Sequence, residues 1–319
     1  MHRLVSVAFL FAGLELGCAP PMPPLVAPKA PTSSLDGPIV VLGDTQRTTF
    51  SERLSGREQN EDARRALIAK IAAEERPAFV VHLGDMVAVG DNPTSWEYFD
   101  RLVSPLTARG IAIFPVLGNH DYWGDDSAAK RQIHRRFPEL RRGAYAMKHR
   151  GLGLVWLNSN LEGRPAHHQT AWFERRLLAF ELDPEVRAVV AFTHHPPFTN
   201  GVARENDDYV HDELVPVLAR HSKTLAMMSG HVHGYERFEV GGRTFVVSGG
   251  GGGPRVAYEM NSPLRPRPAY VPPDGRPRAF HYVVVEPREE SVDFSVKCLK
   301  IDALCRNGAL ERFSLPYPR

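Results

Sequence analysis

Five short groups of polar residues each follow an apolar run and contain side chains that bind divalent metals. They are Gly43-Asp44-Thr45-Gln46, Gly84-Asp85, Gly118-Asn119-His120-Asp121, His194-His195-Pro196-Pro197 and Ser229-Gly230-His231-Val232-His233. Carboxylate, amide and imidazole groups of this kind suit Zn, Mn or Fe. One such group alone would usually be a turn or a surface segment, but five in order along one chain indicate a shared metal site.

The chemistry that these residue types favour is hydrolysis assisted by two metal ions. Six side chains are candidate metal ligands, namely Asp44, Asp85, Asn119, His194, His231 and His233. Two metals ~3.5–4 Å apart need a shared ligand, and such a pair holds a phosphoryl oxygen and lowers the pKa of a bound water that attacks in line. Asp85 is the candidate bridging carboxylate. His120 is the candidate group that stabilises the developing charge or protonates the leaving oxygen, and Asp121 is expected to orient its ring.

The apolar runs before these groups predict buried strands that end at the site. They cover 38–42, 79–83, 111–117, 188–193 and 225–228 and are rich in β-branched and aromatic residues. Open α/β sheets place their chemistry at the carboxyl ends of strands. The strand ends are therefore expected to bring the five polar groups together.

Helical spacing of apolar residues separates these strands and predicts the outer layers. It covers 60–75, 96–106, 169–180 and 212–221. In the first of these, Leu67, Ile68 and Ile71 share one face and Arg64 is expected to lie elsewhere. From Tyr235 onward consecutive strands follow, so the pattern predicts one domain over 38–319 with two packed sheets and helices outside.

Composition is that of an ordinary globular protein and excludes some functions. The chain has 319 residues, of which 43% are hydrophobic, and its 39 Lys and Arg nearly balance 37 Asp and Glu. No long basic run alternates with aromatic residues, which argues against nucleic-acid binding. The glycines at 249–253 lack G-x-G-x-x-G spacing and precede a proline, so they predict a flexible loop near the site rather than a dinucleotide fingerprint.

The first residues are expected to be a targeting segment. A short basic start precedes an apolar stretch over 4–14 that is too short to span a membrane and suits the core of a signal peptide. Residues 1–18 are therefore predicted to be a signal peptide and the Pro-rich residues 19–37 a linker. Gly17-Cys18 resembles a bacterial lipoprotein processing site, although Glu15 stands where an aliphatic residue is usual. We therefore expect the protein to be exported to the bacterial periplasm or attached to the membrane through a lipidated Cys18. We also expect it to be a monomer.

The two remaining cysteines leave two possibilities open. Cys298 and Cys305 could form a disulfide in an exported protein, or they could be two buried free thiols.

Taken in order, the five groups resemble the motifs of the calcineurin-like metallophosphoesterases over roughly residues 38 to 285. The segment GHVHGYER, which begins at Gly230, is similar to the purple acid phosphatase branch. The resemblance implies an α/β fold, a four-layer αββα sandwich in which helices flank two central mixed β-sheets. It also implies that Asp44, Asp85 and His233 hold one metal and that Asp85, Asn119, His194 and His231 hold the other. His120 would stand beside the leaving group, Asn119, His120 and His195 would contact substrate, and His195 could exchange roles with His194.

Two positions depart from the family pattern. The first motif usually reads Asp-x-His, and here its third position is Gln46, whose amide oxygen is a possible but weaker metal ligand. Purple acid phosphatases often carry a tyrosine three residues after the second-motif Asp, where this chain has Ala88. The colour of a tyrosinate–iron pair is therefore expected to be absent, and the departures affect the identity of the two ions (Mn, Zn or Fe, divalent or mixed-valence) more than the reaction class.

The leading interpretation is an exported metal-dependent phosphatase that hydrolyses phosphate monoesters of a small phosphorylated substrate. A phosphodiesterase acting on cyclic nucleotides or lipid head groups is the nearest alternative, and it differs in whether the site tolerates a second ester substituent. A third interpretation is a protein that binds phosphorylated ligands without turnover. Gln46 favours this third interpretation, whereas His120 and Asp85 argue against it.

Overall fold

The computed structural model describes residues 36–202, 206–255, 257–258, 268–270, 279–299, 305 and 308–318. The predicted signal peptide (1–18), the lipidation candidate Cys18 and nearly all of the predicted linker (19–37) lie outside these residues. Within the described part of the chain, none of the helices is long and apolar enough to cross a membrane.

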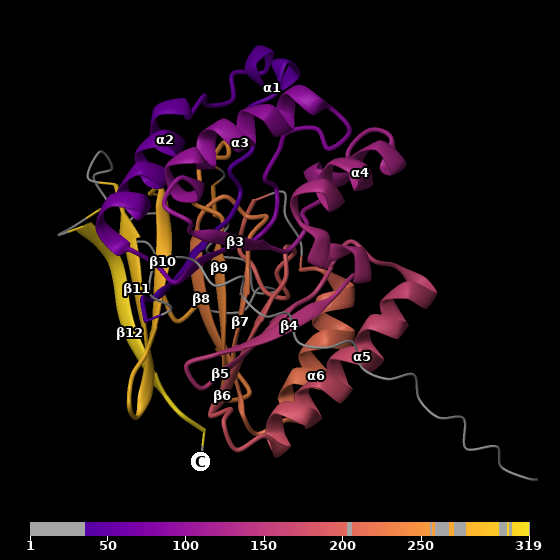
Figure 1. Cartoon of the computed structure of the whole chain (residues 1–319), viewed down its shortest axis with the longest axis vertical. Helices are drawn as coiled ribbons and strands as arrows, with labels where there is room; N and C mark the ends of the chain where they lie inside the picture. Colours follow the sequence, from indigo (N-terminus) through magenta and orange to yellow (C-terminus); the bar gives the residue numbers. More distant parts are fainter. Residues whose placement is uncertain are drawn as a thin grey trace, which may run out of the picture.

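Two six-stranded mixed sheets form the centre of the molecule, and helices lie outside them (Figure 1). The first sheet has the order β12-β11-β10-β1-β2-β3 and the second the order β4-β5-β6-β7-β9-β8. The strands of the first sheet are β1 (Ile39–Leu42), β2 (Phe79–His82), β3 (Ala112–Pro115), β10 (His281–Pro287), β11 (Ser291–Cys298) and β12 (Ala309–Pro316). Those of the second sheet are β4 (Tyr145–His149), β5 (Leu152–Trp156), β6 (Ala188–Phe192), β7 (Thr224–Ser229), β8 (Tyr235–Val240) and β9 (Arg243–Ser248). This arrangement confirms the predicted α/β sandwich with two central sheets.

The strands that lead to the site are parallel neighbours within each sheet. β1, β2 and β3 run parallel, with Leu42 beside His82 and His82 beside Pro115 at their carboxyl ends. β5, β6, β7 and β9 run parallel in the second sheet. Because parallel strands end at the same edge, the loops after them emerge side by side.

The helices are α1 (Phe50–Leu54), α2 (Glu61–Lys70), α3 (Pro93–Thr107), α4 (Asp126–Arg136), α5 (Gly163–Leu182) and α6 (Val215–Ala219). A π-helical segment, Ile71–Glu75, continues α2, and another, Tyr209–Leu214, precedes α6. The predicted helix over 169–180 begins earlier, at Gly163, and the predicted helix over 212–221 is divided near Pro216 between the π-helical segment and α6.

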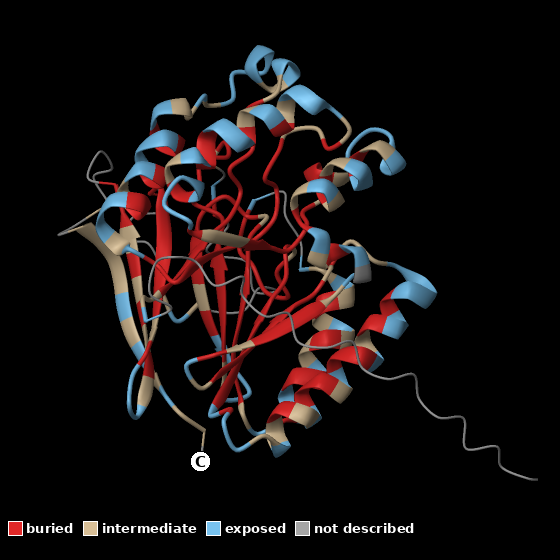
Figure 2. Cartoon of the chain, in the orientation of Figure 1, coloured by how far each residue is buried: buried red, intermediate tan, exposed pale blue. Residues whose placement is uncertain are grey.

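The strands at the centre of the two sheets, β1, β2, β5, β6 and β7, are buried along their whole length because both of their faces are covered (Figure 2). In β5, Val155 packs in one buried cluster with Trp172 and Phe173 of α5, whereas Leu154 belongs to the other cluster, which includes Val41 of the first sheet. Successive residues of a strand point to opposite faces, so one strand serves both layers. The result is a rigid base for the loops at the strand ends.

The structure contains the disulfide that the sequence left open. Cys298, at the end of β11, is bonded to Cys305.

Candidate metal centre

The five polar groups meet at the carboxyl ends of β1, β2, β3, β6 and β7. Backbone hydrogen bonds join these loops, from Asp44 N to Gly84 O and from Gln46 N to Asp85 O (both 3.0 Å). Asp44, Asp85 and His231 have positive φ angles of 60°, 52° and 66°. Such angles are uncommon outside glycine and cluster at functional sites, where the surrounding structure holds the strain.

One group of ligand atoms surrounds the imidazole of His194. Its Nδ1 donates to Leu83 O (2.8 Å), so in the neutral ring Nε2 carries a lone pair. That atom lies 3.2 Å from Asn119 Oδ1, 3.2 Å from His231 Nδ1 and 3.5 Å from Asp85 Oδ1. His194 Nε2 and Asn119 Oδ1 are both acceptors and cannot bond to each other, whereas a cation between them would satisfy both. The group therefore fits a metal ion.

A second group lies on the other side of Asp85. Ligand atoms of Asp44, Asp85 and His233 lie within 4.8 Å of one another, and all three residues are buried. His233 Nδ1 donates to Pro254 O (2.6 Å), which leaves Nε2 as an acceptor 3.6 Å from Asp44 Oδ1. The side-chain nitrogen of Gln46 lies 3.1 Å from both Asp85 Oδ2 and His233 Nε2.

The carboxylate of Asp85 lies between the two groups, with Oδ1 toward His194 and Oδ2 toward Gln46. This is the geometry that a bridging ligand needs. Burial raises the pKa of Asp85, and the nearby histidines, His120 first, oppose that rise. A cation on either side would favour its charged form.

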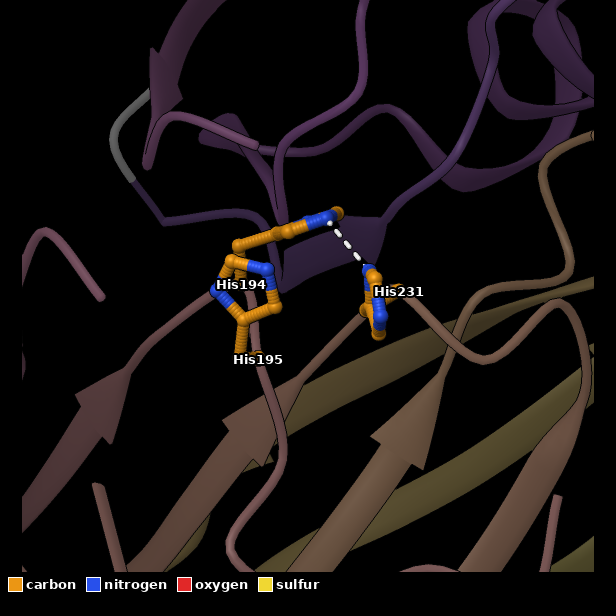
Figure 3. A group of neighbouring side chains, drawn as sticks. All are labelled: His194, His195 and His231. Carbon is orange, nitrogen blue, oxygen red and sulfur yellow. Dashed lines mark hydrogen bonds between the residues drawn. The ribbon is translucent and has the colours of Figure 1, made fainter. Parts of the chain in front are cut away.

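His195 lies beside His194 and His231 (Figure 3). Its ring is 4.5 Å from that of His231, and its Nδ1 lies 2.9 Å from Ser159 Oγ. His194, His195 and His231 could together hold an ion. His194 is fully buried among the acceptors, however, whereas His195 lines a cavity of about 730 Å³ with Asp207 and Tyr209. This geometry favours His194 as the ligand and His195 as a substrate contact.

The structure corrects the expected role of Asp121. Its carboxylate accepts backbone N–H groups of Asp85, Met86, Val87 and Gly118 at 2.9–3.2 Å. Burial, followed by the charge of Asp85, raises its pKa well above the usual range. The ring of His120 is oriented instead by Ala88 O, which accepts from Nδ1 at 2.9 Å. Asp121 therefore holds the loops of the second and third groups together.

Trp123 is a site residue that the sequence reasoning missed. Its ring lies over that of His120, with centroids 3.7 Å apart, and it is 46% exposed. It also lines a cavity of about 570 Å³ together with Asn119, Ile133 and Tyr145. The sequence could have indicated this contact, because Trp123 is an aromatic residue only three positions after His120.

Arg64 is the second residue that was missed, because the sequence placed it off the buried face of α2. It is 2% exposed, and its Nη1 donates to the carbonyls of Gln46 (2.9 Å) and Gly252 (2.8 Å). The sequence could have indicated this burial, because Arg64 precedes Leu67 and Ile68 by three and four residues and therefore shares their helix face. Arg64 ties the first polar group to the glycine loop.

The glycine loop lies at the site, as predicted, but it is packed rather than free. Residues 249–253 are all buried, and Gly251 N and Gly253 N donate to Gly43 O and Asp44 O (both 2.9 Å). A Cβ on Gly253 would lie 2.8 Å from the His233 ring. The glycines are needed because backbone and ligand side chains approach so closely.

The chain also resembles known proteins in sequence and in fold. The family model described as calcineurin-like phosphoesterase matches residues 37–235. A probable cyclic nucleotide phosphodiesterase of Rhodopseudomonas palustris is 28% identical over 207 residues, which are 61% of this chain and 70% of that protein. Purple acid phosphatase 22 of Arabidopsis thaliana is 22% identical over 222 residues, 66% of this chain and 47% of that protein.

The fold resembles that of purple acid phosphatase PPD1 from seeds of yellow lupin (Lupinus luteus). The TM-score is 0.69 at 16% identity, with 88% of this chain and 53% of that chain covered. The chain thus spans about half the length of each of the two plant phosphatases.

Proposed function

The chain belongs to the calcineurin-like phosphoesterase family, and on that basis we propose that it hydrolyses phosphate monoesters at a centre of two metal ions. The observation that carries the proposal is the carboxylate of Asp85, which lies between the two groups of candidate ligands, with Oδ1 toward His194 and Oδ2 toward Gln46. Bound divalent cations would polarise the phosphoryl oxygen and lower the pKa of a coordinated water. Mn, Zn or Fe would suit these donors.

His120 supplies the chain's own contribution at the leaving group. Because Nδ1 donates to Ala88 O, Nε2 faces the centre, 4.0 Å from Asp85 Oδ2. A proton on Nε2 can pass to the leaving oxygen, and the ring of Trp123 covers one face of the imidazole at an interplanar angle of 33°. Asn119 and His195 would contact the phosphate.

The organic part of the substrate has room beside Asn119. The cavity of about 570 Å³ there is lined by apolar and aromatic side chains that include Trp123, Ile133 and Tyr145, and by charged ones such as Asp126 and Lys130. Ligand pockets of this size and character usually hold a small organic molecule. Similarity of the last two motifs to those of purple acid phosphatases, with the match to purple acid phosphatase 22, supports the monoester as substrate.

A phosphodiesterase is the second candidate function, and two observations favour it. The relative from Rhodopseudomonas palustris is named a probable cyclic nucleotide phosphodiesterase. A second cavity, the one beside His195, adjoins the first through Asn160 and Leu161, so a second ester substituent would have space.

Hydrolysis of 4-nitrophenyl phosphate and bis(4-nitrophenyl) phosphate by the full chain, freed of metal and reloaded with Mn or Zn, separates these functions. We expect kcat/KM to be at least about tenfold higher for the monoester, a difference of about 1.4 kcal/mol in transition-state stabilisation. The reverse ratio would establish the diesterase. Absence of turnover with either ion would favour a protein that only binds phosphorylated ligands.

We also propose that the protein is exported and is attached to a bacterial membrane through Cys18. The disulfide between Cys298 and Cys305 supports an oxidising compartment. Labelling of cells with a radioactive fatty acid should mark the wild-type chain and not Cys18→Ala. A labelled Cys18→Ala chain, or an unlabelled wild type, would rule out this anchor.

A further inference from the structure

Gln46 occupies the position between Asp85 and His233 with the nitrogen of its side-chain amide. Nε2 donates to Asp85 Oδ2 and to His233 Nε2, each at 3.1 Å. Both partners are acceptors, since one is a carboxylate oxygen and the other belongs to a ring whose Nδ1 donates to Pro254 O. The two N–H bonds of one amide group therefore satisfy two atoms that a metal ion would otherwise bind.

The oxygen of the same amide is left without a partner. Gln46 is 2% exposed, and its Oε1 is buried and accepts no hydrogen bond from the described residues. A buried polar atom without a partner is unfavourable. Turning the amide about its Cγ–Cδ bond would bring Oε1 toward Asp85 and His233. Three acceptors would then face one another, and only a cation could hold them together.

The backbone of Gln46 is fixed, so the residue can turn its amide but cannot withdraw from the site. Its N–H donates to Asp85 O (3.0 Å) and its carbonyl accepts from Arg64 Nη1 (2.9 Å). Arg64 is held in turn by Gly252 O (2.8 Å) and Tyr98 Oη (3.3 Å).

We propose that the Gln46 amide competes with a metal ion for the position between Asp44, Asp85 and His233, so that the two metal positions have unequal affinities. The inference rests on the metal-dependent function proposed above. At the position around His194 and Asn119, the hydrogen bond between ligand atoms runs from His231 Nδ1 to His194 Nε2 (3.2 Å) and involves no carboxylate, so this position fills first. The position beside Gln46 fills only when the ion displaces two hydrogen bonds, one of them to a carboxylate. We expect its affinity to be weaker by about tenfold or more.

Calorimetric titration of the metal-free full chain with Mn²⁺ tests this directly and needs no variant. We expect one tightly bound ion per chain and a second that binds about tenfold or more weakly. Electron paramagnetic resonance should show an isolated Mn²⁺ at one equivalent and a spin-coupled pair only at excess Mn²⁺. Two ions of equal affinity, with the coupled signal present from the first addition, would overturn the proposal.

Two variants test the assignment to Gln46. Gln46→Glu keeps the shape of the side chain and has acceptor oxygens on both arms, and Gln46→His supplies an imidazole nitrogen. Both should bring the weaker affinity up toward the stronger one. Gln132→His adds a histidine on α4, away from the centre, and should titrate like the wild type. Unchanged titrations of both Gln46 variants would overturn the role of this residue.

The result is separable from that of the proposed function. Two unequal binding steps in a chain that hydrolyses neither ester would support the role of Gln46 and contradict the proposed phosphatase activity. Two equal steps in an active enzyme would do the reverse.

Discussion

At the scale of single residues, His120 and Asp121 are neighbours in sequence with different partners. His120 presents Nε2 to the centre and contacts Asp85 through its backbone N–H (2.9 Å). We expect His120→Ala to keep its bound metal and to lose ~10²–10⁴ in kcat, which is the usual contribution of a general acid. Metal analysis and steady-state kinetics on the same sample check this. A variant that loses its metal would show that His120 is structural.

Asp121→Asn should behave differently, because the carboxylate of Asp121 accepts hydrogen bonds from backbone N–H groups and is not expected to contact the substrate. An amide nitrogen in place of one carboxylate oxygen leaves at least one buried N–H donor without its acceptor, at a cost of about 1–3 kcal/mol of folding stability. Urea unfolding should show this loss, and metal should bind more weakly than in His120→Ala because the Asp85 loop moves. Unaltered stability with a large loss in kcat would restore the direct catalytic role expected from the sequence.

His149 gives the protein a pH dependence that is separate from the metal centre. Burial lowers its pKa to about 4, and its ring packs against Phe79 with centroids 5.0 Å apart. Because the pKa is lower in the folded chain than in the unfolded chain, the stability linked to this group is present above pH 6.5 and is lost as the pH falls toward 4. His149→Gln cannot take up this proton. In urea unfolding, the difference in free energy of unfolding between the wild type and this variant should shrink by about 1–2 kcal/mol from pH 7 to pH 5. A difference that stays constant would contradict the lowered pKa of His149.

At the scale of elements, the glycine loop supports His233 and should tolerate an added side chain less well than the β8–β9 hairpin does. Gly253→Ala would put a Cβ 2.8 Å from the His233 ring, which is held by Pro254 and has little room to move. We expect weaker binding at the position beside Gln46 and near-normal binding around His194. Gly242→Ala is the control, since nothing lies within 4 Å of its Cβ position and its φ of 73° strains only the β8–β9 hairpin. Equal Mn²⁺ titrations of the two variants would show that the glycine loop does not support His233.

The elements also show how far the sequence could be read. Short buried parallel strands are almost wholly apolar, so their ends, and with them the place where the candidate ligands gather, were predictable. The start of α5 at Gly163 was not, because Pro165, His167 and His168 carry no apolar periodicity. Proline is well suited to a first helical turn. Packing of the apolar residues later in α5 stabilises the helix as a whole, including this first turn.

What the sequence could not show were contacts that only the folded chain creates. The ring of His120 was assigned to its neighbour Asp121, although its partner is Ala88 from another loop. Gln46 could be recognised as a departure from the motif, but the direction of its amide depends on Asp85 and His233. The burial of Arg64 likewise depends on carbonyls of two distant loops.

At the scale of the whole molecule, the candidate ligands come from both sheets. Asp44, Asp85 and Asn119 follow β1, β2 and β3, whereas His194 follows β6, and His231 and His233 follow β7. Bound metal would therefore join the two sheets at one edge. An ion that binds the folded chain and not the unfolded chain stabilises the fold by mass action, by about 2.7 kcal/mol at a free concentration 100 times Kd.

We therefore expect Mn²⁺ to raise the melting temperature of the metal-free chain by about 5 °C or more, and a chelator to reverse the rise. Asp85→Asn should abolish the shift, because this carboxylate faces both groups of ligand atoms and its loss weakens each. Gly242→Ala, which changes only the hairpin of the second sheet, should melt lower and still respond fully to Mn²⁺. An equal shift in Asp85→Asn would mean that the stabilising ion binds elsewhere, and the metal would then not join the sheets through this centre.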